Sequence, residues 1–302
     1  MSASAPDAKL TLSRPQAVAL MVLVTLLWAT AGAVTRQLQF ARSFEVTFWR
    51  ALACAVSMGV VLGWQQGAAL WRRILRSPAV FWGSVGCWSV MFSTFMVALT
   101  LTSVGNVLVT MAVGPLLTAL FSWIGLGQRV PLRTWLAIVL AGAGIGAMFV
   151  AQMEAGGALG TLVALCVPVT AAINWTLTQY AHQHGQEVDM VPAVLVGAAV
   201  CAVITLFLAW PLRANFHDAA LLCGLGAFQL ALPCALCIQC TRVLKAPEVS
   251  LLQLLEVVFG IALAWLVANE APTSSVLTGG ALVIVALVGN ELLGIWNSPV
   301  KN

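Results

Sequence analysis

The sequence predicts an all-α polytopic membrane protein with ten transmembrane helices. Of its 302 residues, 61% are hydrophobic and only 8% are charged, and the mean hydropathy is +0.98. These values lie outside the range of soluble globular proteins. Apolar stretches of about 20 residues, the length of a helix that crosses a bilayer, recur along the whole chain.

The ten stretches are separated by charged residues or by Pro and Gly. They lie at residues 17–35, 44–64, 79–100, 104–126, 132–151, 159–181, 190–210, 218–241, 247–268 and 274–296. The first stretch is too long for a signal peptide and no clear small-residue cleavage site follows it, so we expect it to be retained. Connections as short as residues 102–105 require antiparallel neighbouring helices.

Basic residues predict the orientation of the chain. Lys and Arg are concentrated at the termini and in the loops after the even-numbered stretches: Lys9, Arg14, Arg72, Arg73, Arg76, Arg129, Arg133, Arg242, Lys245 and Lys301. The opposite loops hold only Arg36, Arg42 and Arg213. Because cytoplasmic loops carry the excess of positive charge, both termini are expected in the cytoplasm.

The two halves of the chain resemble each other at an offset of 142 residues, which aligns Trp123 with Trp265 and Ala137 with Gly279. The predicted organisation is an N-terminal tail (1–15), a first five-helix repeat (16–151), a linker (152–158), a second repeat (159–296) and a C-terminal tail (297–302). Five spans per copy is an odd number, so the second copy is inverted. Inverted repeats place a binding site near the membrane midplane and support alternating access.

Glu256 and Gln253 interrupt the apolar stretch at 247–268 and are three residues apart, so they share one helix face. A carboxylate at this depth is costly unless something faces it. One hypothesis is that Glu256 binds a substrate ammonium group or a coupling proton in a cavity. The alternative is an ion pair or hydrogen bond that fixes helix packing.

Arg50 lies about two turns into the second stretch, and Glu45 precedes it by five residues. Arg50 has the geometry to bind a substrate carboxylate through two parallel hydrogen bonds. Alternatively, it pairs with Glu45 or Glu256, or extends its charge to the nearby surface.

Tryptophans inside the spans, beside polar residues, suggest a pocket for a planar amphipathic ligand. Trp88 precedes Ser89 and Thr94, and Asn174 adjoins Trp175; Trp28 lies within the first span. For each tryptophan the alternative is packing between helices or contact with lipid.

The fourth stretch carries Asn106, Thr110, Gly114 and Pro115. Proline lacks a backbone N–H, so this helix is expected to kink in the membrane and expose carbonyl groups. The kink serves either as a hinge for gating or as packing geometry.

Several function classes lack their signatures. The sequence contains no phosphate-binding loop and no long basic run, so ATP hydrolysis and nucleic-acid binding are not expected. Cys234, Cys237 and Cys240 are expected to pack as small apolar residues, and the pair His182 and His184 is a weak metal motif. We therefore expect no enzyme activity, metal or cofactor.

The segments LLWATAGAVTR, FWRALACA, PLLTALFSWIGLGQRV and LLQLLEVVFGIALAWLVANEAP resemble the paired EamA domains of the drug/metabolite transporter superfamily. Within it the chain is most similar to bacterial aromatic amino-acid exporters of the YddG type. The resemblance implies two inverted five-helix repeats, a multi-pass protein of the bacterial inner membrane and a central cavity.

The sequence thus predicts a secondary transporter that exports small amphipathic metabolites, with aromatic and other neutral amino acids as the leading substrates. Export of drugs or cationic compounds is the nearer alternative, and a membrane-embedded enzyme or lipid-handling protein is the alternative from another class. Glu256 allows proton coupling without requiring it, and the sequence leaves the oligomeric state open.

Overall fold

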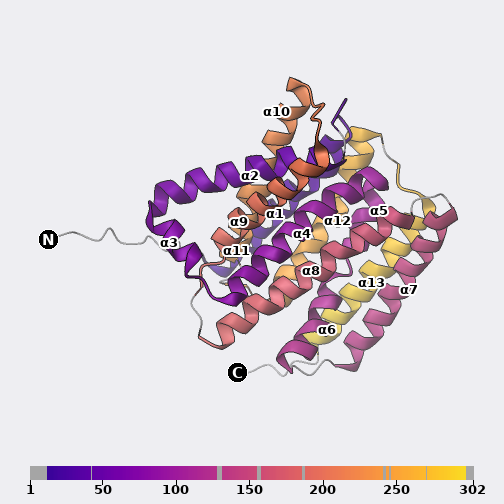
Figure 1. Ribbon diagram of the computed structural model, residues 1–302. Coiled ribbons are helices and arrows are strands. Elements are labelled where there is room, and N and C mark those ends of the chain that lie inside the picture. Colours follow the sequence, from indigo (N-terminus) through magenta and orange to yellow (C-terminus); the bar gives the residue numbers. More distant parts are fainter. Residues whose placement is uncertain are drawn as a thin grey trace.

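The computed structural model describes residues 12–41, 43–127, 131–154, 158–185, 188–240, 243–244, 246–269 and 271–296. Helices fill all ten predicted stretches, and the described residues contain no strand (Figure 1). The predicted tails lie almost wholly outside the described residues, as do the central residues of the linker. The helices are α1 (Arg14–Thr35), α2 (Ser43–Gln66), α3 (Ala69–Leu75), α4 (Ala79–Leu101), α5 (Val104–Met111), α6 (Gly114–Leu126), α7 (Leu132–Glu154), α8 (Ala158–Gln183), α9 (Val191–Ala209), α10 (Phe216–Gly224), the π-helix η1 (Leu225–Ala231), α11 (Leu232–Cys240), α12 (Ala246–Ala268) and α13 (Ser274–Trp296).

The all-helical class is confirmed. Within the described residues, seven helical stretches are long and apolar enough to cross a membrane, and shorter apolar stretches lie in α7, α12 and α13. Ten membrane crossings and cytoplasmic termini therefore remain predictions. The sequence analysis did not predict α3, a short helix in the connection between α2 and α4.

Helices of the two predicted repeats pack against each other in related pairs. In the first repeat, α1 contacts α11 and α12; in the second, α8 makes the equivalent contacts with α4 and α6. Their second helices, α2 and α9, pack together, as do their last helices, α7 and α13 (Figure 1). This exchange of partners is what two copies of one unit produce when they face each other, so the sites at their centre draw on both halves.

Two helices are interrupted for the same reason. Pro115 has no N–H to donate to the carbonyl of Met111, and the helix is interrupted there, between α5 and α6. Pro233 likewise has no N–H for the carbonyl of Gln229, and the preceding turn widens into η1, where Leu232 N–H donates to Ala227. The predicted interruption of the fourth stretch is thus present, whereas its role in gating stays a prediction.

Gly226 places η1 directly against α2. A Cβ atom at this position would overlap the carbonyl oxygen of Arg50 and come within 2.6 Å of the Ala53 Cβ atom and 2.9 Å of the Cys54 nitrogen. We expect Gly226→Ala to lower the free energy of unfolding by about 1 to 3 kcal/mol, because backbone atoms cannot move aside as side chains do. The melting temperature in detergent measures this loss.

Gly224→Ala is the matched control for that substitution. Gly224 lies two residues earlier in the same span, and a Cβ atom there would meet nothing within 4 Å. Its melting temperature should stay close to that of the wild type. Equal behaviour of the two variants would contradict the close approach of η1 to α2.

Candidate functional site

A central cavity of about 970 Å³ of empty space, part of it open to the outside, lies between the two halves of the protein. Its walls come from α1, α2, α4, α5, α6, α8, η1, α11 and α12. Most of the lining side chains are apolar or aromatic, among them Trp28, Trp88, Phe92, Phe95 and Trp175. An apolar cleft with few polar groups is the usual form of a small-molecule site.

The aromatic side chains form a connected wall. The rings of Trp88 and Trp175 are 6.2 Å apart and nearly perpendicular, and Trp88 lies 5.4 Å from Phe92. Edge-to-face packing of this kind fixes ring orientation. The wall thus joins α4 of the first repeat to α8 of the second and offers ring surface to a planar ligand.

Arg50 supplies a positive charge to the cavity and is held by a neutral amide. Its Nε and Nη2 atoms donate to Gln229 Oε1 at 3.0 and 2.8 Å, and its guanidinium lies 5.5 Å from the centre of the Phe95 ring. Gln229 in turn donates to the backbone carbonyl of Trp28 at 3.0 Å. Nη1 of Arg50 donates no hydrogen bond to any described residue, so this nitrogen is available to a ligand.

Glu256 supplies a negative charge to the same cavity. The side chain is 8% exposed, and its carboxylate makes neither a hydrogen bond nor an ion pair within 4 Å to the described part of the chain. Gln253 also lines the cavity from α12. The cavity therefore contains a carboxylate and a guanidinium that do not neutralise each other by direct contact.

The suggested pairing of Arg50 with Glu45 or Glu256 is not what the structure shows, since Arg50 contacts Gln229 instead. Glu45 lies away from the cavity, where its Oε1 accepts the backbone N–H groups of Arg213 and Ala214 at 2.8 and 2.7 Å. The five-residue spacing between Glu45 and Arg50 separates the two side chains along α2.

The predicted site residues divide into two groups. Those that line the cavity are Trp28, Arg50, Trp88, Gly114, Pro115, Trp175, Gln253 and Glu256. Those that lie outside the lining are Glu45, Ser89, Thr94, Asn106, Thr110 and Asn174. Their roles in binding or gating stay predictions.

The polar residues of the second group mostly bond within the helix bundle. Asn106 donates to Thr161 at 2.6 Å, Asn174 accepts from Ser84 at 2.6 Å, and the Thr110 hydroxyl donates to the carbonyl of Asn106. The first two bonds hold α5 and α4 against α8, and the third lies within α5. These residues therefore bond to one another in the bundle rather than line the cavity, although the buried Asn106 Oδ1 has no hydrogen-bond partner among the described residues.

Gln229 is the functional candidate that the sequence analysis missed. It is an amide within an apolar span, the same signal that singled out Gln253, and Pro233 four residues later marks a distortion of that span. Phe92 and Phe95 gave no signal, because aromatic residues in an apolar helix are ordinary. Their position in the wall depends on how α4 is turned in the bundle.

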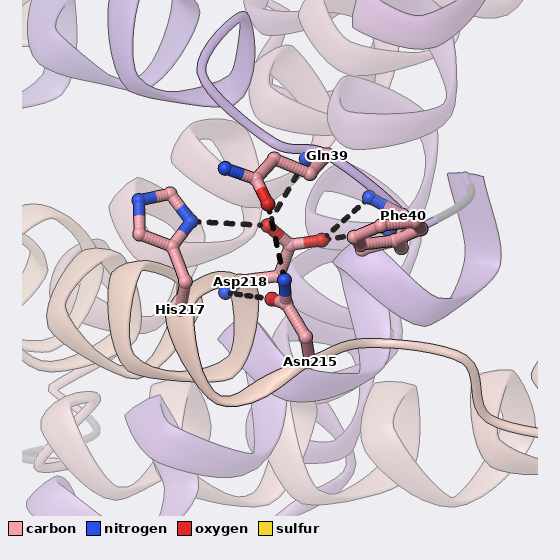
Figure 2. Close-up of polar contacts among 6 residues, drawn as sticks. Gln39, Phe40, Asn215, His217 and Asp218 are labelled. Carbon is pink, nitrogen blue, oxygen red and sulfur yellow. Dashed lines mark hydrogen bonds and ion pairs between the residues drawn. The ribbon is translucent and has the colours of Figure 1, made fainter.

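At one end of the bundle, two buried carboxylates connect the two halves, and Figure 2 shows that of Asp218. Asp218 of α10 accepts the backbone N–H groups of Gln39, Phe40 and Ala41 at 3.0, 2.8 and 2.9 Å. Glu45 makes the reverse connection, from α2 to the segment before α10. The first connection holds the loop after α1 against α10, and the second holds the segment after α9 against α2.

Around Asp218, neighbouring side chains complete the network. Asn215 caps α10 by accepting the backbone N–H of Asp218 at 2.8 Å, and its amide donates to Gln39 at 3.1 Å. His217 Nδ1 lies 3.3 Å from Asp218 Oδ1. As Figure 2 shows, the carboxylate lies between the loop after α1, which donates backbone N–H groups to it, and His217 of α10.

Metal and catalytic groupings were also sought in the part of the chain that the structure describes. It contains no group of three or more His, Cys, Asp or Glu side chains placed to hold a metal ion. The eight cysteines are free thiols.

A comparison with protein-family models matches the chain twice, at residues 15–150 and 158–290, to the EamA-like transporter family. A solved structure whose title reads "Crystal structure of protein" has the same fold, with a TM-score of 0.62 and 20% identity over 93% of this chain and 99% of that chain. No curated protein matches the sequence. The two family matches together cover most of the chain, and the chain is thus a membrane transport protein with two EamA domains that belongs to the EamA-like transporter family.

Proposed function

We propose that the protein is a secondary transporter that exports aromatic and other neutral amino acids through the central cavity by alternating access. The observation that carries this proposal is the pair of opposite charges in one aromatic cavity. A free α-amino acid carries an ammonium and a carboxylate at neutral pH, and burying either group without a partner is costly. The cavity offers a separate partner to each.

Each part of the substrate has a candidate partner. The substrate carboxylate would accept hydrogen bonds from Arg50, whose Nη1 is unoccupied, and the ammonium would donate to Glu256. The aromatic side chain would pack against Trp88 and Trp175. Gln229 would hold Arg50 in place by accepting from its other two nitrogens.

The direction of transport and the location are proposed on the family resemblance. They are export and the bacterial inner membrane, with the repeats rocking around the cavity. Glu256 makes proton coupling a testable part of the proposal. Its carboxylate would bind either the substrate ammonium group or a proton, so the release of one would accompany the binding of the other.

Purified protein in sealed liposomes loaded with labelled phenylalanine tests the proposal. We expect efflux above that of loaded liposomes without protein and competition by unlabelled tryptophan and phenylalanine. If a proton is carried, efflux should also respond to an imposed pH gradient. Efflux at the rate of protein-free liposomes would contradict the amino-acid substrate.

One observation favours a second function, the export of cationic drugs or dyes. Glu256 is unpaired in an aromatic cavity, and a carboxylate with aromatic surfaces is a common site for organic cations. Arg50 opposes this substrate class because its positive charge lies in the same cavity. Efflux of a viologen dye, together with no efflux of phenylalanine from the same liposomes, would favour the cation exporter.

A further inference from the structure

We propose that a second pocket, at the end of the bundle opposite the loops joined by Asp218, binds the phosphate group of an anionic phospholipid. The pocket has about 1140 Å³ of empty space, part of it open to the solvent, and lies where the end of α2, the short helix α3 and the first turns of α4 and α9 meet. It is separate from the central cavity, and the two pockets share no lining residue. The proposal does not depend on which substrate is transported.

Three guanidinium groups make the pocket strongly basic. Arg72, Arg73 and Arg76 line it, and among the described lining residues Asp189 supplies the only carboxylate. None of the three arginines is in an ion pair with a described residue, and the single hydrogen bond from their guanidinium groups is a long one, 3.5 Å from Arg73 to Gln66. Asp189 is partly committed elsewhere, because it accepts the backbone N–H of Val191 at the start of α9.

Three arginines within five residues repel one another unless an anion lies between them. Guanidinium groups bind phosphate through paired N–H donors, and Gln66 and Ser77 add polar atoms to the same pocket. The ligand that fits this chemistry is a phosphate group.

The surroundings of the pocket indicate that the phosphate belongs to a lipid. On α3, Leu70 and Ile74 are buried against the protein, whereas Trp71 and Leu75, on the adjacent face of the helix, are 58% and 76% exposed. Trp64, at the end of α2, is 91% exposed. Tryptophans next to arginines at helix ends are typical of the membrane boundary, where rings lie at the level of the headgroups.

This arrangement gives each part of a phospholipid its own contact. The phosphate would lie among the arginines, and the acyl chains would extend along the exposed apolar face of α3 and the end of α2. The pocket lies at the end of the protein that the basic residues assign to the cytoplasm, where anionic lipids attract such clusters. A soluble phosphate compound would use the arginines but not the exposed Trp71 and Leu75.

Thermal unfolding of the full chain in a neutral detergent tests the proposal. Phosphatidylglycerol, phosphatidylcholine and glycerol phosphate are titrated separately into the wild type and into the triple variant Arg72→Gln, Arg73→Gln, Arg76→Gln. We expect phosphatidylglycerol alone to raise the melting temperature of the wild type. The triple variant should need at least about tenfold more of it for the same shift, because each arginine near an anionic headgroup adds to the affinity.

Arg213→Gln is the control for the loss of an arginine away from the pocket. Its side chain is exposed at the other end of the bundle, so the response to phosphatidylglycerol should stay that of the wild type. Should the triple variant fail to fold, each arginine is replaced singly and bound lipid is counted by native mass spectrometry of the wild type and the single variants. Wild-type protein that retains phosphatidylglycerol, and single variants that retain less, would support the site.

Three results would overturn the proposal. The first is an equal shift by phosphatidylglycerol in the wild type and the triple variant, which would place the lipid elsewhere. The second is an equal shift by glycerol phosphate, which would make the ligand a soluble anion. The third is no preference for phosphatidylglycerol over phosphatidylcholine, which would leave the arginines without a role in lipid binding.

Discussion

Glu256→Gln should reduce the efflux of phenylalanine from loaded liposomes by at least about tenfold. The substitution keeps the size of the side chain and removes the charge that would face the substrate ammonium group. A hydrogen bond to a charged group contributes about 1.5 to 3 kcal/mol, which corresponds to roughly 10- to 100-fold in binding. Folding should be little affected, because no described residue depends on the Glu256 carboxylate for a hydrogen bond or ion pair.

Substrate analogues separate the role of Glu256 from a general loss of transport. Phenylpropionate has the aromatic ring and the carboxylate of phenylalanine but lacks the ammonium group. In the wild type, phenylalanine should compete better than phenylpropionate, and in Glu256→Gln the two should compete about equally. A variant that still favours phenylalanine as strongly as the wild type would remove Glu256 from ammonium binding.

Thr94→Val is the control variant for the same assay. Thr94 was a candidate for the site, but it lies outside the cavity lining, and its hydroxyl donates to the carbonyl of Val90 on its own helix. The two side chains have nearly the same shape. Efflux should therefore stay within about twofold of the wild type, a free-energy difference of about 0.4 kcal/mol.

Asp218→Asn should lower the free energy of unfolding by about 2 to 4 kcal/mol. The carboxylate is buried and accepts three backbone N–H groups from the loop after α1. The amide keeps one oxygen and points an N–H₂ group at donors, so part of the network loses its acceptor. Each buried donor left without a partner costs about 1 to 3 kcal/mol.

Hydrogen exchange measures this effect at the bonds themselves. In Asp218→Asn, the amides of Gln39, Phe40 and Ala41 should exchange faster than in the wild type, and the melting temperature in detergent should fall. If the exchange of these amides is unchanged, Asp218 does not hold the loop.

His217→Ala serves as the control for this end of the bundle. The side chain of His217 is 51% exposed and contacts Asp218 at 3.3 Å. Exposed ion pairs contribute about 0 to 1 kcal/mol. Its removal should change both measurements far less than the substitution of Asp218.

The helical class and the position of each long helical stretch could be predicted from the sequence alone, whereas the short helix α3 could not. Runs of about 20 apolar residues can satisfy their backbone hydrogen bonds in a membrane only as helices, so composition and length suffice. The break before Pro115 followed from a missing N–H. Glu256 was identifiable because a carboxylate in an apolar span requires a reason.

Which polar residues share a cavity was decided by the tertiary structure. Asn106 and Asn174 have the same composition signal as Gln253, yet they bond to Thr161 and Ser84 and leave the cavity to others. The rotation of each helix and its choice of neighbours determine which polar residues face the cavity. A span that is apolar on every face does not indicate either of them. Within a span the sequence shows which side chains are costly to bury, but it does not show which partners they bond to.

The long-range partners make the same point at the ends of the bundle. Arg50 and Gln229 are 179 residues apart, and the carboxylate of Asp218 reaches backbone groups 177 to 179 residues away. Every residue except proline has the same backbone N–H group, so the sequence does not show which backbone groups donate to Asp218. The sequence by itself determined that this chain forms apolar helices with a few buried charges. Only packing of the two halves decided which charges face the cavity and which join loops, because a buried charge takes whichever partner the fold brings within hydrogen-bond distance.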